Sequence, residues 1–386
     1  MKRGLFLIIV LFQCLQTYSQ SGFIWDNYHF DNRFRRYITY VPQKYFDENK
    51  AVPVIFALHG FGDNIDNFRG IGFHKIADTA NFIVVFPEAL PVPVLGSNGW
   101  NSGAALVGEI PFNDGVDDVG FLNSLMDTIM SRYMIDSSRV YFAGYSFGAF
   151  MCNRMACEER DRIAAIGTVS GTIGSALECN PGGSMPIIYF HGTSDNVIDF
   201  QTNAYGLPAF ENLKFWVNNN TCNNEADTVR VPDIADDYRR IIHYTYHDCT
   251  QGDEVEFYKV NNGEHEWLFE GENDMDYNKT IWAFFQKWQR SQVPTGVFNH
   301  QIIGGELKVF PNPGQQDLYV DISRLDNVGL KSVQVLDLVG KVILEKNITQ
   351  QNDNYIRLSV DASSGIYFIK VIAEDGKSKS IKWVKE

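Results

Sequence analysis

The sequence predicts an α/β protein with a doubly wound, mostly parallel sheet, followed by a small all-β sandwich. Over residues 20–290, short and continuous apolar runs alternate with helix-like stretches. This is typical of strands that are buried on both faces of a parallel sheet. Over residues 307–386, polar and apolar residues instead alternate in short segments divided by turn residues, which indicates a sandwich. We interpret residues 291–306 as the linker.

The chain begins like an exported protein. Lys2 and Arg3 precede an apolar segment, and small residues follow near Ser19, so residues 1–19 are expected to form a signal peptide. No other apolar run approaches the roughly 18 residues that a membrane-spanning helix needs. We therefore expect a secreted protein without a membrane span.

Five cysteines remain after residue 19, which in an oxidising compartment predicts two disulfides and one spare thiol. Cys222 and Cys249 flank one polar segment and are expected to pair, as are Cys157 and Cys179. Cys152 lies on a helix-like stretch, where a buried and inert thiol is expected. No Cys and His spacing suggests a metal site, and we expect no cofactor.

The negative charge is unevenly distributed. The formal net charge is −14, yet residues 307–386 hold 11 basic and 10 acidic side chains, so the first module carries the excess. A strongly acidic surface repels nucleic acids and anionic lipid surfaces. We therefore expect a neutral substrate and no nucleic-acid partner.

The elements of the first module follow from its apolar runs, and together they fit one domain over residues 20–290. Helical spacing of apolar residues predicts helices over 116–133 and 281–288. Strands are expected at 53–58, 82–86, 140–143, 165–169, 187–190 and 255–260.

The second module, residues 307–386, is predicted to contain six or seven short strands. It has no cluster of Ser, His or Cys that could carry chemistry. Strands are expected at 307–310, 318–322, 333–337, 341–344, 356–360 and 365–371.

A G-x-S-x-G motif at residues 144–148 lies directly between the expected strand at 140–143 and a helix-like stretch at 149–156. In this context the motif forms a sharp turn that exposes a strained serine. A Cβ atom at either glycine would collide with the neighbouring strand or helix. Ser146 is the candidate nucleophile.

The partners that a serine nucleophile needs follow in the chain. Asp195 comes just after the strand at 187–190, and His265 lies in a glycine-containing loop after the strand at 255–260. Strand ends of this kind gather at one edge of a parallel sheet. The order Ser, Asp, His therefore predicts a triad of Ser146, Asp195 and His265.

Each partner has rivals. Asp199 lies four residues beyond Asp195, whereas Asp117 begins a helix, where an acidic residue complements the dipole. His247 competes with His265 but lies among strand-like residues beside a cysteine. His191 and His59 both stand in His-Gly turns and are interpreted as residues that shape loops.

Two further features would complete a site. An oxyanion hole needs two backbone N–H groups, and those of Phe61 and Phe147 are in the expected places. Trp100 and Trp267 stand near the predicted loops and could stack on a sugar or a phenolic acyl group. The alternative for both tryptophans is apolar filling beneath these loops.

The motifs together resemble the secreted esterase family of polyhydroxybutyrate depolymerases and feruloyl or acetylxylan esterases, which have the α/β-hydrolase fold. The resemblance covers about residues 35–290 and rests on five segments. These segments are 59–60, 117–122, 135–148, 191–195 and 263–267.

The resemblance implies that Ser146 is the nucleophile, Asp195 the orienting acid and His265 the base. It also implies the disulfide between Cys222 and Cys249. The implied substrates are feruloyl or acetyl esters of plant polysaccharides, with polyhydroxybutyrate second.

The sequence departs from the family pattern at five positions, which concern the pocket more than the triad, and one departure is the missing proline after Trp267. Ala149 and Phe61 stand where glycine and cysteine are common, and Glu264 and Glu266 flank the histidine. Two other classes stay open, a serine peptidase and a catalytically silent binding protein on the same scaffold.

The second module resembles the C-terminal sorting domain of type IX secretion cargo, through residues 309–313, 336–341, 364–371 and the basic end at 379–385. This implies that the type IX machinery is a partner and that the protein leaves the cell through the outer membrane. The alternative is a carbohydrate-binding or spacer sandwich.

Overall fold

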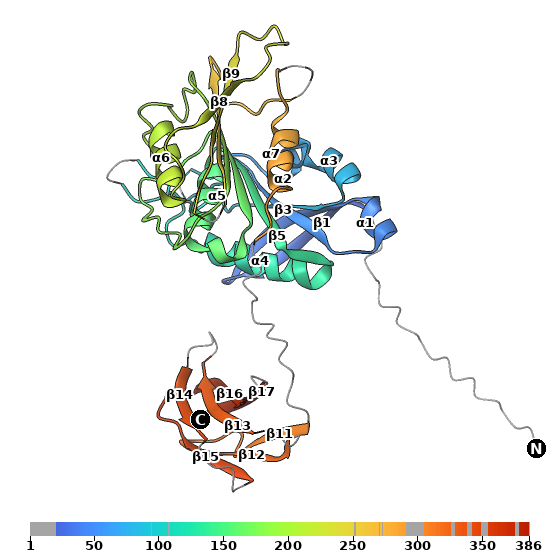
Figure 1. The fold of residues 1–386 in the computed structure, drawn as a ribbon, viewed down its shortest axis with the longest axis vertical. Coiled ribbons are helices and arrows are strands. Elements are labelled where there is room, and N and C mark those ends of the chain that lie inside the picture. Colours follow the sequence, from blue (N-terminus) through green and yellow to red (C-terminus); the bar gives the residue numbers. More distant parts are fainter. Residues whose placement is uncertain are drawn as a thin grey trace, which may run out of the picture. The chain divides into compact units, whose positions relative to one another are not determined.

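The computed structural model describes residues 21–290 and 305–385, with short gaps at 94, 107–108, 251, 270, 272, 326–328, 338–341, 349–353 and 375–377. The predicted signal peptide and residues 291–304 of the predicted linker lie outside the described residues. The chain forms two compact units that divide at Ser291 and Gln292. Figure 1 shows the elements of each unit.

The first unit is built on a ten-stranded sheet with the order β1-β2-β4-β3-β5-β6-β7-β10-β9-β8. The six central strands from β4 to β10 are parallel to their neighbours, and the two strands at each edge are antiparallel. The strands are β1 (Gly22–Phe30), β2 (Arg33–Val41), β3 (Val52–Leu58), β4 (Ile83–Pro87), β5 (Ile135–Tyr145), β6 (Ala165–Val169), β7 (Ile187–Gly192), β8 (Asp227–Arg230), β9 (Arg240–Tyr246) and β10 (Val255–Asn261).

Helices cover both faces of this sheet (Figure 1). Residues of α4, α5 and α6 belong to one hydrophobic core, and residues of α2, α3 and α7 belong to the other. The helices are α1 (Gln43–Glu48), α2 (Ile65–Phe68), α3 (Phe73–Ala80), α4 (Asp118–Arg132), α5 (Phe147–Glu158), α6 (Ala209–Asn219) and α7 (Tyr277–Phe285).

The continuous apolar runs of the central strands reflect this double covering. Every residue of β3 is buried. Val54 and Phe56 enter one core, while Ile55 and Ala57 enter the other, because successive side chains of a strand point to opposite faces. The fold class that the sequence predicts is confirmed.

The edge strands were not predicted. All four residues of β8 are exposed, and β1 alternates between exposed and half-buried residues, so neither carries an apolar run. The predicted helix over 281–288 begins earlier, at Tyr277, after Asp276 caps its first turn by accepting a hydrogen bond from the Lys279 amide.

The second unit consists of two antiparallel sheets. Their inward-facing residues form one hydrophobic core, which includes Val320 and Val335. The last strand, β17, was not among the predicted strands, although its Trp383 is fully buried in that core. The sheets are β11-β12-β15 and β14-β13-β16-β17, built from β11 (Gly305–Phe310), β12 (Asp317–Leu325), β13 (Leu330–Leu336), β14 (Val342–Asn347), β15 (Tyr355–Ser359), β16 (Gly365–Ala373) and β17 (Ser378–Lys385).

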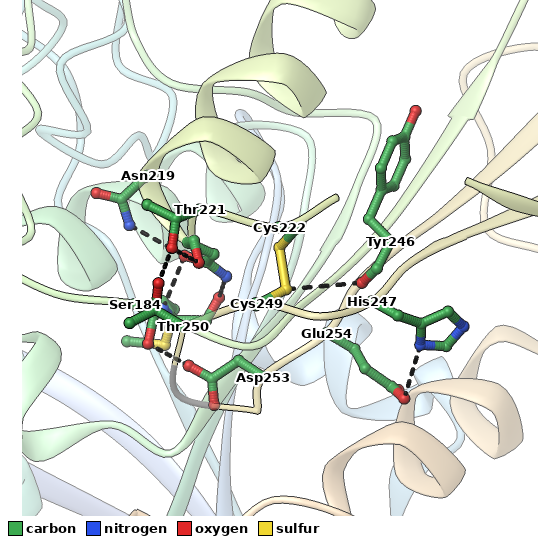
Figure 2. The surroundings of a disulfide bond; sticks show 12 residues. Ser184, Asn219, Thr221, Cys222, Tyr246, His247, Cys249, Thr250, Asp253 and Glu254 are labelled. Atoms are coloured by element: carbon green, nitrogen blue, oxygen red, sulfur yellow. Dashed lines mark hydrogen bonds and ion pairs between the residues drawn. A yellow bond between two sulfur atoms is a disulfide. The ribbon is translucent and has the colours of Figure 1, made fainter. Parts of the chain in front are cut away.

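Both predicted disulfides form, and Cys152 is a buried free thiol. The bond between Cys222 and Cys249 joins the chain after α6 to the turn before β10 (Figure 2). Closing a loop of 27 residues lowers the conformational entropy of the unfolded chain, which stabilises the folded state by about 3–4 kcal/mol. Burial raises the pKa of the Cys152 thiol well above its ordinary value, so this thiol is expected to be inert.

No helix in the described residues combines the length and the apolar character that are needed to cross a membrane.

Candidate active site

Ser146 occupies a strained turn between β5 and α5. Its backbone has φ of 54° and ψ of −122°, a conformation that residues other than glycine rarely adopt. A Cβ atom on Gly144 would lie 2.3 Å from the Gly148 carbonyl oxygen, and one on Gly148 would lie 2.1 Å from the Leu58 oxygen. Both glycines of the motif are therefore required by close backbone approach, as the sequence indicated.

The structure brings Ser146, Asp195 and His265 together. His265 Nε2 lies 3.0 Å from Ser146 Oγ, and its Nδ1 lies 2.8 Å from Asp195 Oδ2. The three residues follow β5, β7 and β10, which are parallel strands of one sheet. Their carboxyl ends therefore meet at one edge.

Asp195 is held as a carboxylate. Its Oδ1 accepts hydrogen bonds from the amides of Val197 (2.9 Å) and Ile198 (2.8 Å). Burial by itself raises the pKa of Asp195, but the hydrogen bond and charge of His265, the charge of His191 and the Ile198 amide lower it below its ordinary value overall.

The carboxylate determines the tautomer of His265. An ionised carboxylate only accepts hydrogen bonds, so we assign the ring proton to Nδ1, which donates to Asp195. Nε2 is then the acceptor that faces the Ser146 hydroxyl. This is the arrangement that proton removal from a serine requires.

The rival carboxylates lie elsewhere. Asp199 accepts hydrogen bonds from the amides of Gln201 and Thr202, and Asp117 caps α4 by accepting from the Gly120 amide. Among the described contacts, neither side chain reaches His265.

The rival histidines have structural surroundings. His247 is half-buried and lies 3.4 Å from both Asp227 and Glu254. His191 is buried behind the Asp195 loop, 2.7 Å from the Ile198 oxygen.

His59 shapes the loop after β3. Its Nδ1 donates to the Gly60 oxygen (2.7 Å), and its Nε2 accepts from the Ala89 amide (3.0 Å). Burial lowers the pKa of His59 to about 4, so the ring is neutral.

A cavity of about 410 Å³ opens beside Ser146. One wall is aromatic, with Phe147 in ring contact with Phe61 at 5.3 Å, Phe112 at 5.1 Å and Tyr205 at 6.0 Å. The remaining lining residues are Gly60, Asp63, Leu95, Tyr145, Ser146, Val197, Ile198 and His265. Among the described residues, Asp63 and His265 are thus the only ionisable side chains other than tyrosines that line this space.

The two amides predicted for the oxyanion hole lie on the two segments that approach each other at Ser146. The loop after β3 approaches the elbow closely, since a Cβ atom on Gly60 would lie 3.3 Å from Ser146 Cβ. The Phe147 amide is the first of α5, where N–H groups have no partner within the helix. Among the described hydrogen bonds, neither the Phe61 amide nor the Phe147 amide donates to a protein acceptor.

The expectation that Trp100 and Trp267 bind substrate is wrong for this structure, because neither lines the cavity. Trp100 is fully buried and donates to the His59 oxygen (3.0 Å). Trp267 is buried between Phe73 and Tyr277. Both tryptophans fill space beneath the loops, which was the alternative interpretation.

One supporting group escaped the sequence analysis. Asp118 is fully buried, pairs with Arg35 (2.7 Å) and accepts from the Asn101 amide (2.7 Å). This network anchors the loop that carries Trp100. Arg35 and Asp118 are 83 positions apart, so no local pattern signals the pair.

The described residues contain no group of three His, Cys, Asp or Glu side chains that could hold a metal ion.

Comparison with known proteins adds two family matches. Residues 46–214 match the phospholipase/carboxylesterase family, and residues 308–386 match the secretion system C-terminal sorting domain.

Several curated relatives are fungal esterases. Feruloyl esterase D of Neurospora crassa is 26% identical over 274 residues, which cover 67% of this chain and 83% of the relative. A probable feruloyl esterase C of Aspergillus clavatus is 29% identical over a stretch that covers 49% of this chain and 62% of the relative. A bifunctional acetylxylan esterase/xylanase of Neocallimastix patriciarum is 25% identical over 61% of this chain, which spans only 31% of that relative.

Among solved structures, the acetyl xylan esterase from Aspergillus awamori aligns with 68% of this chain and 99% of its own, at 16% identity and a TM-score of 0.46. By its family matches and curated relatives, the chain is a carboxylic ester hydrolase with an α/β-hydrolase unit, in which residues 46–214 match the phospholipase/carboxylesterase family and residues 308–386 match a secretion-system sorting domain.

Proposed function

We propose that this protein is a secreted serine esterase that removes feruloyl or acetyl groups from plant polysaccharides. The observation that carries the proposal is the hydrogen-bonded chain of Asp195, His265 and Ser146, which opens on a cavity with an aromatic wall. The similarity to feruloyl esterases and to an acetylxylan esterase supports both acyl groups.

The reaction begins at Ser146. Its Oγ attacks the ester carbonyl carbon while its proton passes to His265 Nε2, 3.0 Å away. The carboxylate of Asp195 stabilises the imidazolium that forms and keeps the ring in place. The strained backbone at Ser146 holds Oγ in the open cavity, so no rearrangement is needed before attack.

The negative charge that develops on the carbonyl oxygen goes to the amides of Phe61 and Phe147. Collapse of this intermediate breaks the bond to the alcohol, which takes the proton from His265 and leaves. Water then attacks the acyl-enzyme, with His265 as the base, and the free acid departs. The cycle regenerates the Ser146 hydroxyl.

The cavity favours an acyl group with an aromatic ring. Phe61, Phe112, Phe147 and Tyr205 offer ring edges and faces at which a phenolic ring can pack. The volume of about 410 Å³ is within the range of small-molecule sites. Asp63 also disfavours an acyl group that carries its own negative charge.

The test compares kcat/KM on methyl ferulate, acetylated xylan and polyhydroxybutyrate, with Ser146→Ala beside the parent protein. We expect methyl ferulate or acetylated xylan to be preferred, and Ser146→Ala to lower kcat by about 10⁴-fold or more. A fluorophosphonate probe should label the parent protein and leave Ser146→Ala unlabelled. Parental hydrolysis by Ser146→Ala would overturn the mechanism, and a preference for polyhydroxybutyrate would overturn the substrate.

A further inference from the structure

Glu266, the residue after His265, makes an ion pair that the esterase chemistry does not explain. Its two oxygens pair with Arg239, at 2.7 Å for Nε and 2.5 Å for Nη2. Two parallel bonds of this kind fix the orientation of both groups. The pair is only partly exposed, with 20% of the Arg239 side chain and 27% of the Glu266 side chain accessible.

The same carboxylate also bonds to the backbone of the residue before His265. Glu266 Oε1 accepts a hydrogen bond from the Glu264 amide at 3.1 Å. The backbone from 264 to 266 is thereby folded around His265. Glu264 itself contributes its amide to this contact.

Arg239 is held firmly at the end of the segment that leads into β9. Its amide donates to Asp237 Oδ1 at 2.9 Å, and its Nη1 donates to the Asp237 oxygen at 3.3 Å. The next residue back, Tyr238, is kept at φ of 59°. A bulky residue keeps such a backbone conformation only where its surroundings impose it.

Two further contacts join this segment to the loop that carries His265. Asn262 Nδ2 donates to the Tyr238 oxygen (2.9 Å), and Asn261 Nδ2 donates to the Arg240 oxygen (3.0 Å). On its other side the same loop is bonded to the Asp195 loop, through the Ser194 amide and the Gly263 oxygen (2.8 Å). The loop therefore lies between two supports.

We propose that the Arg239–Glu266 pair, supported by Asp237 and by the backbone of Tyr238, is a clamp that positions His265 between Asp195 and Ser146. The proposal rests on the function proposed for those three residues. Neither Arg239 nor Glu266 lines the cavity, so both act through His265 as positioning residues. A displacement of the imidazole by about 1 Å can lower a catalytic rate by up to about 100-fold.

A stabilising ion pair without a positioning role makes a different prediction. A partly exposed pair contributes about 0–1 kcal/mol to folding, and its loss would lower the melting temperature slightly and leave turnover unchanged. Measuring kcat and KM separately therefore distinguishes a positioning role, which lowers kcat, from a purely stabilising one, which leaves it unchanged.

The experiment compares Arg239→Gln, Glu266→Gln and the double variant with the parent protein. Glu266→Gln keeps one oxygen that can accept from the Glu264 amide, so it removes the charge and one of the two bonds from Arg239 but spares this backbone contact. Arg240→Gln is the matched control, since the Arg240 side chain pairs with Asp233 (2.8 Å), donates to the Arg239 backbone oxygen and has no described contact with Glu266 or the His265 loop.

We expect each single variant to lower kcat about 10-fold, with KM within about two-fold of the parental value. The double variant should be no slower than either single variant, because the two side chains act as one pair. The rate of fluorophosphonate labelling at Ser146 should fall by the same factor as kcat. Arg240→Gln should match the parent in each measurement.

Arg239→Lys adds an independent test, because lysine keeps the charge but cannot make two parallel bonds. It should recover part of the lost turnover, and it replaces Arg239→Gln if that variant does not fold. Parental kcat in Glu266→Gln and Arg239→Lys, or additive losses in the double variant, would overturn the clamp. Failure of the esterase mechanism would appear separately, as activity in Ser146→Ala.

Discussion

At the scale of single residues, the aromatic wall of the cavity depends on Phe112. This ring contacts Phe61, Phe147 and Tyr205, and so completes the surface at which an aromatic acyl group would pack. An acetyl group is too small to reach the whole of this surface. Loss of the ring should therefore affect the two proposed acyl groups differently.

We expect Phe112→Ala to lower kcat/KM for methyl ferulate about 10-fold and to leave p-nitrophenyl acetate within about two-fold. The control is Phe269→Ala, since Phe269 is also part-exposed but does not line the cavity. Equal losses on both esters would show that the ring supports the site as a whole.

His59 makes stability depend on pH. Its pKa is about 4 in the folded protein and 6.5 ordinarily, so between these values the unfolded chain binds more protons than the folded one. The stability that this difference supplies is complete above pH 6.5 and is lost as the pH falls through 4. The loss amounts to about 3 kcal/mol.

We expect His59→Asn to be less stable than the parent at pH 7 but to lose less stability between pH 6.5 and 4. Asparagine does not titrate, and its amide can donate to the Gly60 oxygen as His59 Nδ1 does. Urea unfolding at several pH values measures the slope. Identical slopes for both proteins would contradict the assignment.

At the scale of elements, the elbow depends on how closely β3 and β5 approach α5. Gly148 lies on the first turn of α5 directly against β3, with the Leu58 and His59 oxygens in the space that a side chain would occupy. A methyl group there must push backbone away from backbone, which costs more than the displacement of a flexible side chain.

Gly148→Ala should therefore lower the free energy of unfolding by about 3–5 kcal/mol. Gly70→Ala is the matched control, since no atom lies within 4 Å of its added Cβ, and it should change stability by less than about 1 kcal/mol. Thermal unfolding of both variants tests this. A Gly148→Ala protein of parental stability would mean that the approach at the elbow is looser than described.

The strands also show which parts of the fold can be predicted from the sequence pattern alone. Four of the six central strands, β3, β4, β6 and β7, are continuous apolar runs, so they could be predicted within a few residues. The strand β5 begins five residues before the predicted one, because its first residues are polar. The edge strands β1 and β8 could not, because each is exposed on at least one face and its residues resemble those of loops. Their place in the sheet comes from pairing with β2 and β9.

At the scale of the whole molecule, each unit has cores of its own. The two cores of the first unit and the single core of the second unit share no residue. The residues proposed for catalysis all belong to the first unit. Hydrolysis should therefore not require the second unit, whose family match is to a sorting domain.

A chain that ends at Ser291 should hydrolyse soluble esters with a kcat/KM within about two-fold of the full chain. In a bacterium with a type IX system, it should stay inside the outer membrane, whereas the full chain should reach the medium or the cell surface. Assays of activity and of cell fractions check the two statements separately. Export of the shortened chain would contradict the proposed sorting role.

The sequence by itself predicted the apolar central strands, the elbow glycines and the three residues proposed as the triad. These features follow from local rules, because the end of a parallel strand places its loop at one edge whatever the distant contacts are. The tertiary structure alone decided what surrounds the triad. Trp100 and Trp267 are buried, and Arg239 reaches Glu266 across 27 positions, because burial and long-range pairing depend on which distant segments meet.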